Sequence, residues 1–302
     1  MGQEQDFCYT HTPILTSNDC EGAGEAFRIA PIPLDSSSSA PEQMDEFFSR
    51  PSYLTVSSQL HLEALASAIS RVYTISPCFR AEKSQTNRHL AEFWMLEAEW
   101  AFVEDVGEIC DVVEEVIKEV IRENAPIGLL GNVAAEKKWA RISYREAIEH
   151  LSKHHDSSAR AAFTFSPCWG KPLQSEHERW LADHLVGGPV FVTNYPASLK
   201  PFYMRLNPDK ETVACFDLFV PHLGELVGGS LREERLDFLE HALDSRGLSR
   251  KEYDWYLDLR KFGGAPHGGF GMGFDRLVAW LSGVENVREC IPMPRWAGRM
   301  LL

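Results

Sequence analysis

The sequence predicts an α+β fold in which an antiparallel β-sheet is flanked by helices. Residues 93–102 alternate between two kinds of side chain, as a half-buried strand does. Residues 106–121 carry apolar side chains at helical spacing. Strand-like segments follow one another without regular βαβ alternation, which argues against a parallel sheet. The chain has 302 residues, of which 44% are hydrophobic and 25% charged, so it can bury the core that such a fold needs.

The first third of the chain predicts an irregular start, a helix and a strand. Residues 1–34 are expected to be extended or irregular. Ser57 and Ser58 precede apolar residues at helical spacing, which predicts a helix with a serine cap. Residues 72–82 predict a strand that is broken near Pro77.

The predicted strand at 93–102 has one wholly apolar face. Its opposite face carries Glu97 and Glu99 beside Phe93 and Met95. Two carboxylates on a strand with an apolar back are a candidate floor for a binding site. The alternative is a half-exposed antiparallel strand whose glutamates are solvated.

The rest of the chain is expected to supply an insertion, further strands and two more helices. Residues 124–190 have weaker periodicity and predict a helical insertion. The predicted strands and helices after it are 190–195, 212–221, 231–246 and 274–282. Gly247 and Gly283 are expected to end the two helices, and the glycine-rich run at 263–273 reads as a turn-rich loop.

Composition argues against several classes of protein. The seven cysteines form no CxxC pair, which indicates free thiols in a reducing compartment. No apolar run approaches the roughly 20 residues of a membrane span. The first eight residues include acidic but no basic side chains, unlike a signal or transit peptide. The net charge of −14 favours a small-molecule enzyme, so any nucleic-acid contact would need a local basic patch.

Three clusters of polar and glycine residues, at 79–93, 217–233 and 268–276, suit a nucleoside triphosphate. Arginine forks match phosphate oxygens, and one or two carboxylates can hold Mg²⁺ against phosphates. Glycines let the backbone approach a flat base closely. Each cluster also has a simpler explanation: the arginines can form ordinary salt bridges, Asp217 can be a satisfied core acid, and His89 and His267 can be structural. Neither GxxxxGK[ST] nor GxGxxG is present.

The order of the clusters resembles the class II aminoacyl-tRNA synthetases, specifically the asparaginyl-tRNA synthetases. The stretch 79–93 resembles motif 2 of that family, 269–277 resembles motif 3, and 12–25 resembles the end of motif 1. The stretch 200–205 is most similar to the bacterial and mitochondrial branch. The resemblance implies a single class II catalytic domain over residues 1–302.

The resemblance implies that ATP is bound by motifs 2 and 3. Arg80 is expected to contact the α-phosphate and Arg276 the γ-phosphate, and both are expected to be catalytic. Phe93 is expected to stack on adenine, with Arg276 over the other face of the base. The other residues expected at ATP are Glu82, His89, Glu225 and Gly273.

The resemblance also implies a Mg²⁺ site and an amino-acid site. Asp217 and Glu225 are expected to hold Mg²⁺. The residues expected at the amino acid are Glu21, Gln59, Glu97 and Arg232, with the arginine on the side-chain carbonyl. Related aspartyl enzymes usually carry a lysine shortly after the glutamine that matches Gln59. Leu60, His61, Leu62 and Glu63 follow here, which favours a neutral asparagine over a charged aspartate.

The expected function is asparagine–tRNA ligase, in which ATP activates asparagine and tRNA(Asn) receives it. One alternative is an ammonia-dependent asparagine synthetase, against which the missing lysine argues. Another is a non-catalytic paralogue that binds tRNA or a partner, against which Arg80, Glu225 and Arg276 argue.

The resemblance leaves the context of this domain open. The N-terminal anticodon-binding barrel of the family, and the long helix that precedes the stretch matching Thr12-Pro13, are expected to be absent. A shortened form of a longer protein and a short protein with altered function both explain this. Full-length family members are expected to be homodimers. The expected location is mitochondrial, with a cytoplasmic one as the alternative, and no membrane partner is expected.

Overall fold

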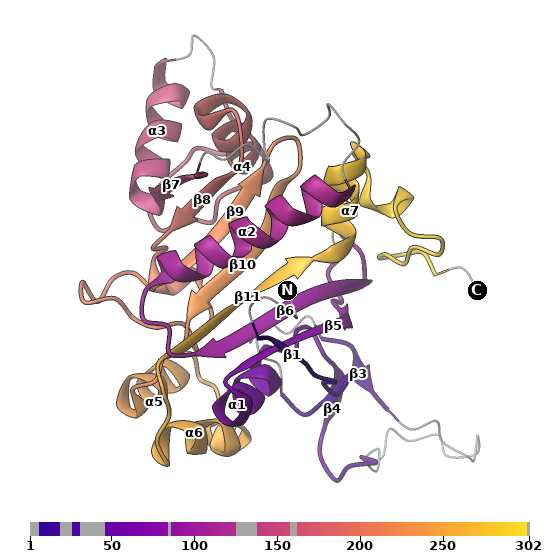
Figure 1. Cartoon of the computed structure of the whole chain (residues 1–302), viewed down its shortest axis with the longest axis vertical. Helices are drawn as coiled ribbons and strands as arrows, with labels where there is room; N and C mark the ends of the chain where they lie inside the picture. Colours follow the sequence, from indigo (N-terminus) through magenta and orange to yellow (C-terminus); the bar gives the residue numbers. More distant parts are fainter. Residues whose placement is uncertain are drawn as a thin grey trace, which may run out of the picture.

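The computed structural model describes residues 6–18, 26–30, 46–83, 86–124, 138–157 and 162–300. Its main feature is an eight-stranded sheet, in which antiparallel pairs predominate and the two outermost pairs are parallel (Figure 1). The strands, in spatial order, are β1 (Cys8–Tyr9), β5 (Arg71–Phe79), β6 (Glu92–Ala101), β11 (His267–Gly273), β10 (Gly224–Leu231), β9 (Cys215–Val220), β8 (Val190–Thr193) and β7 (Ala140–Ser143). A small second sheet contains β2 (Leu15–Thr16), β4 (Ser52–Leu54) and β3 (Arg28–Ile29). The predicted α+β class is confirmed.

The helices flank this sheet. The α-helices are α1 (Gln59–Ile69), α2 (Val106–Asn124), α3 (Tyr144–Ser157), α4 (Ser175–Trp180), α5 (Leu236–Ser245), α6 (Asp254–Lys261) and α7 (Phe274–Ser282). A π-helical turn, η1 (Leu181–Val186), continues α4, and short 3₁₀ turns are η2 (Ala197–Leu199), η3 (Arg250–Tyr253) and η4 (Val287–Glu289). None of the helices within the described ranges is long and apolar enough to cross a membrane.

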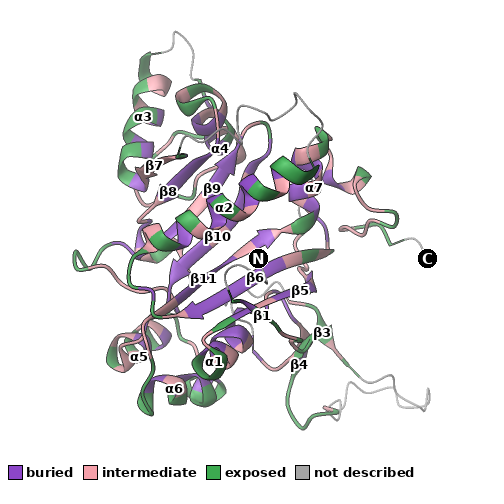
Figure 2. Ribbon diagram, viewed as in Figure 1, coloured by how far each residue is buried: buried purple, intermediate pink, exposed green. Residues whose placement is uncertain are grey.

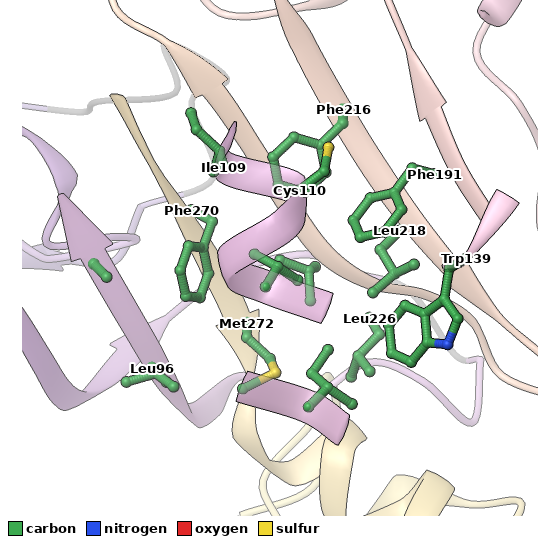
Figure 3. Packing of buried hydrophobic residues seen from close by; sticks show 14 of the residues in the cluster. Leu96, Ile109, Cys110, Trp139, Phe191, Phe216, Leu218, Leu226, Phe270 and Met272 are labelled. Carbon is green, nitrogen blue, oxygen red and sulfur yellow. The ribbon is translucent and has the colours of Figure 1, made fainter. Parts of the chain in front are cut away.

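Helix α2 lies across one face of the sheet and seals it with apolar side chains (Figure 1). Figure 3 shows Ile109 and Cys110 of this helix among Phe216, Phe270 and Met272 from the strands. All five are buried, and the sheet strands form the most buried part of the ribbon in Figure 2. Because successive side chains of a strand point to opposite faces, sealing one face leaves the other to carry polar groups.

The alternation of β6 is confirmed, and its apolar face packs under α2. Leu96, Ala98 and Trp100 belong to the core cluster that includes α2. The opposite side chains, Glu97 and Glu99, therefore point toward the other face of the sheet. Helix α1 begins directly after Ser58, and Ser57 Oγ accepts a hydrogen bond from the backbone N–H of Gln59 at 3.1 Å, so the serine-capped start is confirmed.

Two predictions about local structure are wrong because sheet pairing overrides residue preference. The glycine-rich run at 263–273 is largely a strand, β11, paired on both sides, and not a turn-rich loop. The break expected near Pro77 does not occur, because β5 pairs with β6 along its full length. Pro77 is tolerated there because β1 pairs with the other side of β5 only at 72 and 73, so the edge is open at the proline.

Other boundaries shift along the chain. The helix expected from 231 begins at Leu236, because Leu231 is still part of β10, a strand that the sequence did not predict. Gly247 and Gly283 follow their helices with positive φ, as expected. The region at 124–190 contains α3, α4 and η1 but also adds strand β7 to the sheet; residues 125–137 and 158–161 lie outside the described ranges.

Candidate active site

Two connected cavities open on the face of the sheet that α2 leaves uncovered. Cavity A measures about 290 Å³, and cavity B about 80 Å³. Cavity A is lined mainly from β6, β10, α1 and the segment 199–204, and cavity B from motif-like stretches around β6 and α7. The residues that line both are Arg80, Met95, Glu225 and Gly271. One elongated ligand can therefore occupy both cavities.

The floor of cavity A holds buried carboxylates. Glu97 and Glu99 are 3% and 1% exposed, so the solvated strand considered from the sequence is excluded. Glu97 accepts hydrogen bonds from the Ser57 hydroxyl and from the backbone N–H of Ser58 at 2.9 Å. Burial raises the pKa of Glu97. The carboxylate is thus held in a fixed position at the wall of cavity A.

Arg232 is fixed by a fork of hydrogen bonds. Its Nε and Nη2 donate to Glu99 at 3.1 and 2.8 Å, and its Nη1 donates to Ser230 Oγ at 2.6 Å. The guanidinium is 3% exposed. Gly269 makes this arrangement possible, because a Cβ at that position would lie 2.2 Å from Glu99 Oε2. The glycines of β11 thus leave room for side chains of the neighbouring strand.

Gln59 enters cavity A in one defined orientation. Its Nε2 donates to Glu63 Oε1 at 3.1 Å, which leaves its carbonyl oxygen as the free acceptor end. Glu63 also accepts from Tyr256, from Arg260 Nη2 at 2.6 Å and from His267 Nε2 at 3.0 Å. Arg260 and His267 outweigh the effect of burial and lower the pKa of Glu63, so this carboxylate is an anion.

Lys200 and Asp217 form the second ion pair of cavity A. Lys200 Nζ lies 2.7 Å from each carboxylate oxygen of Asp217. Glu225 stands beside them, because a Cβ on Gly228 would lie 3.5 Å from Asp217 Oδ1 and 3.7 Å from Glu225 Oε1. The two carboxylates expected to hold Mg²⁺ therefore meet at one place, with a lysine bound to one of them.

Cavity B is lined by cations near an aromatic ring. The Arg80 guanidinium carbon lies 5.4 Å from the centre of the Phe93 ring. Arg80 Nη1 is 3.8 Å from Glu82 Oε1, and His89 Nε2 is 3.3 Å from Glu82 Oε2. Burial, together with nearby arginines, lowers the pKa of His89. A flat ring beside a guanidinium suits a purine next to its phosphates.

Arg276 and Arg88 complete the positive wall of cavity B. Arg276 Nη1 donates to the backbone carbonyl of Glu225 at 3.1 Å and lies 3.7 Å from its Oε2. Arg88 Nη1 lies 2.6 Å from Glu178 Oε2 and 3.2 Å from the Leu223 carbonyl. Burial and the neighbouring cations Arg88 and Arg80 lower the pKa of Arg276. Mutual repulsion of this kind favours a polyanion in the cavity.

The structure brings the predicted residues together, with one outside its described ranges. Arg80, Arg276 and Glu225 all line cavity B, so they can contact one ligand. The other members of the predicted ATP group that line it are Glu82, His89, Phe93 and Gly273. Gln59, Glu97, Arg232 and Asp217 line cavity A. Glu21 is among the residues that the structure does not describe.

Four residues of this site were not predicted as functional. Arg88 and Lys200 lie within stretches whose resemblance to the family was noted, so the signal for them was present. Glu63 and Glu178 carried none, because each meets its partners only through the fold. Glu178, for example, lies 90 positions from Arg88 in the sequence.

The sheet and its two connected cavities match solved structures of class II synthetases. The crystal structure of asparaginyl-tRNA synthetase from Pyrococcus horikoshii complexed with asparaginyl-adenylate superposes with a TM-score of 0.83 at 34% identity, over 97% of this chain and 64% of that one. A family model described as tRNA synthetases class II (D, K and N) matches residues 2–297. The chain therefore belongs to this family.

Relatives place the chain beside the asparaginyl members. It is 48% identical to asparaginyl-tRNA synthetase of Mus musculus, over 99% of this chain and 64% of the relative. It is 46% identical to the mitochondrial asparagine–tRNA ligase of Saccharomyces cerevisiae, over 97% of this chain and 64% of the relative. The chain thus spans somewhat less than two thirds of the length of these relatives.

Proposed function

We propose that this chain is the catalytic domain of an asparagine–tRNA ligase, which uses ATP to activate asparagine as the adenylate and transfers it to tRNA(Asn). The observation that carries the proposal is the junction of cavities A and B at Arg80 and Glu225. An amino acid in cavity A and ATP in cavity B would meet at this junction, where the new bond has to form.

ATP would bind in cavity B with its phosphates toward Arg80. Phe93 would stack on adenine, and Glu82, His89 and Gly273 would line the rest of the nucleotide. Arg276 would contact the γ-phosphate. Relatives with asparaginyl-adenylate in their printed titles support this use of ATP.

Asparagine would bind in cavity A through groups that are already fixed. Glu97 would receive the α-amino group together with Gln59, whose free end is an acceptor; Glu21 is a further candidate for this role. Arg232 would meet the side-chain carbonyl. The two cations, Arg232 and Lys200, already have carboxylate partners, so an additional aspartate carboxylate would be buried without a counter-charge, which is costly.

The chemical step would be in-line attack of the asparagine carboxylate on the α-phosphorus, with pyrophosphate leaving. Arg80 would stabilise the charge that develops on the α-phosphate, and alignment of the two substrates supplies much of the remaining acceleration. Glu225 and Asp217 are the candidates to hold Mg²⁺, which would bridge and neutralise phosphate oxygens. The terminal adenosine hydroxyl of tRNA would then attack the adenylate, without a covalent enzyme intermediate.

ATP–pyrophosphate exchange with asparagine and with aspartate, run in parallel, tests the proposal. Exchange with asparagine alone supports the ligase, and charging of tRNA(Asn) completes the test. Exchange with aspartate alone, with consumption of ammonia, would support an asparagine synthetase. Exchange with neither would contradict the proposed activity of this chain and favour a non-catalytic binding protein. Arg276→Ala serves as the control for a contaminating synthetase, because it removes a proposed ATP contact.

We further propose that the domain acts as a homodimer, as expected for the full-length family, and in mitochondria, with the cytoplasm as the alternative. Similarity to the mitochondrial yeast ligase supports this location, although bacterial ligases are about as similar. Sedimentation of the purified chain tests the dimer. Fractionation of the source cells with an antibody against the chain tests the location.

A further inference from the structure

The Lys200 ammonium is a cation that the fold holds in one place. Its Nζ lies 2.7 Å from both oxygens of Asp217 and 4.0 Å from the centre of the Tyr195 ring. Both side chains of the ion pair are 15% exposed. The Lys200 backbone is fixed as well, because its carbonyl accepts from Arg246 Nη2 and its N–H lies 3.4 Å from the Ala197 carbonyl.

Lys200 remains charged in this environment. Burial alone would lower the pKa of Lys200, but the Asp217 carboxylate more than compensates and raises it above its ordinary value. The charge stands within the region where a metal would be expected, since Asp217 and Glu225 flank the same glycine, Gly228. A divalent cation at Asp217 would therefore have to approach a fixed positive charge.

Glu225 differs from Asp217 in its surroundings. Its side chain is 41% exposed, and Arg276 Nη1 is 3.7 Å from its Oε2, well beyond a hydrogen bond. It also lines both cavities, whereas Asp217 lines only cavity A. Mg²⁺ keeps several waters and commonly needs only one or two carboxylates in addition to substrate phosphates. Glu225 is therefore sufficient as the protein ligand of a nucleotide-bound ion.

We propose that Lys200 acts as a built-in cation that occupies Asp217, so that of these two carboxylates only Glu225 binds the divalent ion that accompanies ATP. This rests on the proposed function, and it departs from the two-carboxylate site that the sequence suggested. Lys200 would supply at Asp217 the positive charge that a second ion would otherwise bring. The competing arrangement is one in which Lys200 moves aside and Asp217 also ligates the ion.

Binding of Mn²⁺ in the presence of α,β-methylene-ATP, followed by electron paramagnetic resonance on the full chain, distinguishes the two arrangements. The decisive variant is Lys200→Met/Asp217→Asn, because removing both members of a buried pair is much less disruptive than removing one. We expect its affinity for Mn²⁺ to stay within about threefold of the unmodified chain, and that of Glu225→Gln to fall by about tenfold or more. The single variant Lys200→Met should bind Mn²⁺ more tightly or bind a second ion, since Asp217 then lacks its cation.

The outcomes separate this proposal from the proposed function. If the double variant loses Mn²⁺ as strongly as Glu225→Gln, Asp217 is a ligand and the role of Lys200 is overturned, while ATP binding stands. If the unmodified chain shows no nucleotide-dependent Mn²⁺ signal, the proposed function falls and this proposal with it. Circular dichroism of each variant verifies that the measured loss is one of metal and not of folding.

Discussion

Cavities A and B share a wall but hold their charges in different ways. In cavity A the pairs are tight: Lys200 Nζ lies 2.7 Å from Asp217, and Arg232 Nη2 lies 2.8 Å from Glu99. These side chains are almost wholly enclosed. The charge pattern of cavity A is therefore set before a substrate arrives.

Cavity B contains looser contacts between unlike charges. Arg80 lies 3.8 Å from Glu82, and Arg276 lies 3.7 Å from the Glu225 carboxylate. Guanidiniums at these distances have not formed strong forked pairs with these acids, so phosphate oxygens can compete for them. The difference suggests a division of roles: cavity A selects one amino acid by shape and charge, whereas cavity B supplies cations that engage as the nucleotide binds.

Breaking the tight pair of cavity A should have the largest effect. Arg232→Met leaves Glu99 buried without a counter-charge, so we expect the free energy of unfolding to fall by about 3–5 kcal/mol. Urea denaturation followed by circular dichroism measures it. Exchange with asparagine should be lost in the fraction that remains folded.

The double variant Arg232→Met/Glu99→Leu separates stability from binding. It removes both charges, so it should recover most of the lost stability without recovering asparagine-dependent exchange. Recovery of exchange in this variant would show that Arg232 does not contact the amino acid. Unchanged stability of the single variant would contradict the description of cavity A as a set of obligatory pairs.

Removing a cation of cavity B should affect chemistry more than structure. Arg80→Ala should slow adenylate formation by about 100- to 1,000-fold, equivalent to about 3–4 kcal/mol, because a preset donor to the developing charge is lost. Pre-steady-state measurement of the adenylate gives this rate. Asparagine binding by calorimetry should change little and is the internal control. Adenylate formation at normal speed would contradict the proposed role of Arg80.

Arg88 is the exception in cavity B, because it is tightly paired. Glu178 of α4 accepts from Arg88 Nη1 and, at 3.3 Å, from the backbone N–H of Glu225, so it positions two parts of the cavity wall. We expect Glu178→Gln to raise the KM for ATP by about tenfold, or 1.4 kcal/mol, with a smaller change in kcat. Steady-state exchange at varied ATP measures this.

Glu176→Gln is the matched control for this experiment. Glu176 lies on the same helix, and its carboxylate caps the backbone N–H groups of Thr164 and Phe165 instead of contacting cavity B. An equal rise of the KM in both variants would indicate a general disturbance of α4. A rise confined to Glu178→Gln would extend the nucleotide site into the region at 124–190.

The fold was predictable where periodicity is strong. The alternation of β6 and the apolar stripe of α2 are local patterns, and both elements appear as expected. Strand β11 was missed because glycine has a poor preference for strands. Its reason lies in the neighbouring strand: a Cβ on Gly271 would lie 2.6 Å from Met95 Cε, and one on Gly269 would clash with Glu99. Such a requirement arises from packing between strands, so a single segment does not reveal it.

The site was predictable only as far as each residue carries its own signal. Arginines, glycines and paired acids in a familiar order indicated the cavity-lining residues. The partner of each charge was not predictable, because Lys200 reaches Asp217, and Glu63 reaches Arg260 and His267, through the folded chain. Distances between such groups decide which carboxylates remain available to a ligand.

The smallest expected effect concerns His267, behind cavity A. Its Nε2 faces Glu63 Oε2 at 3.0 Å and its Nδ1 faces the Ala265 carbonyl at 2.9 Å, so both nitrogens face acceptors. Burial opposes a charge on the ring, but Glu63 prevails and raises the pKa of His267. The protonated ring then stabilises the folded state fully below the unfolded-state pKa of about 6.5, and this contribution is lost as pH rises through the folded-state pKa.

Urea denaturation of the chain and of His267→Gln across neutral to alkaline pH tests this. The difference in free energy of unfolding between the two should shrink as pH rises. The acidic range is excluded, because the lowered pKa of Glu63 makes its own contribution fall away below about pH 4.3. His241→Gln, which changes an exposed histidine of α5, is the control and should leave the pH profile unaltered. A constant difference between chain and His267→Gln would mean that the ring is neutral, and cavity A would then be backed by one cation fewer.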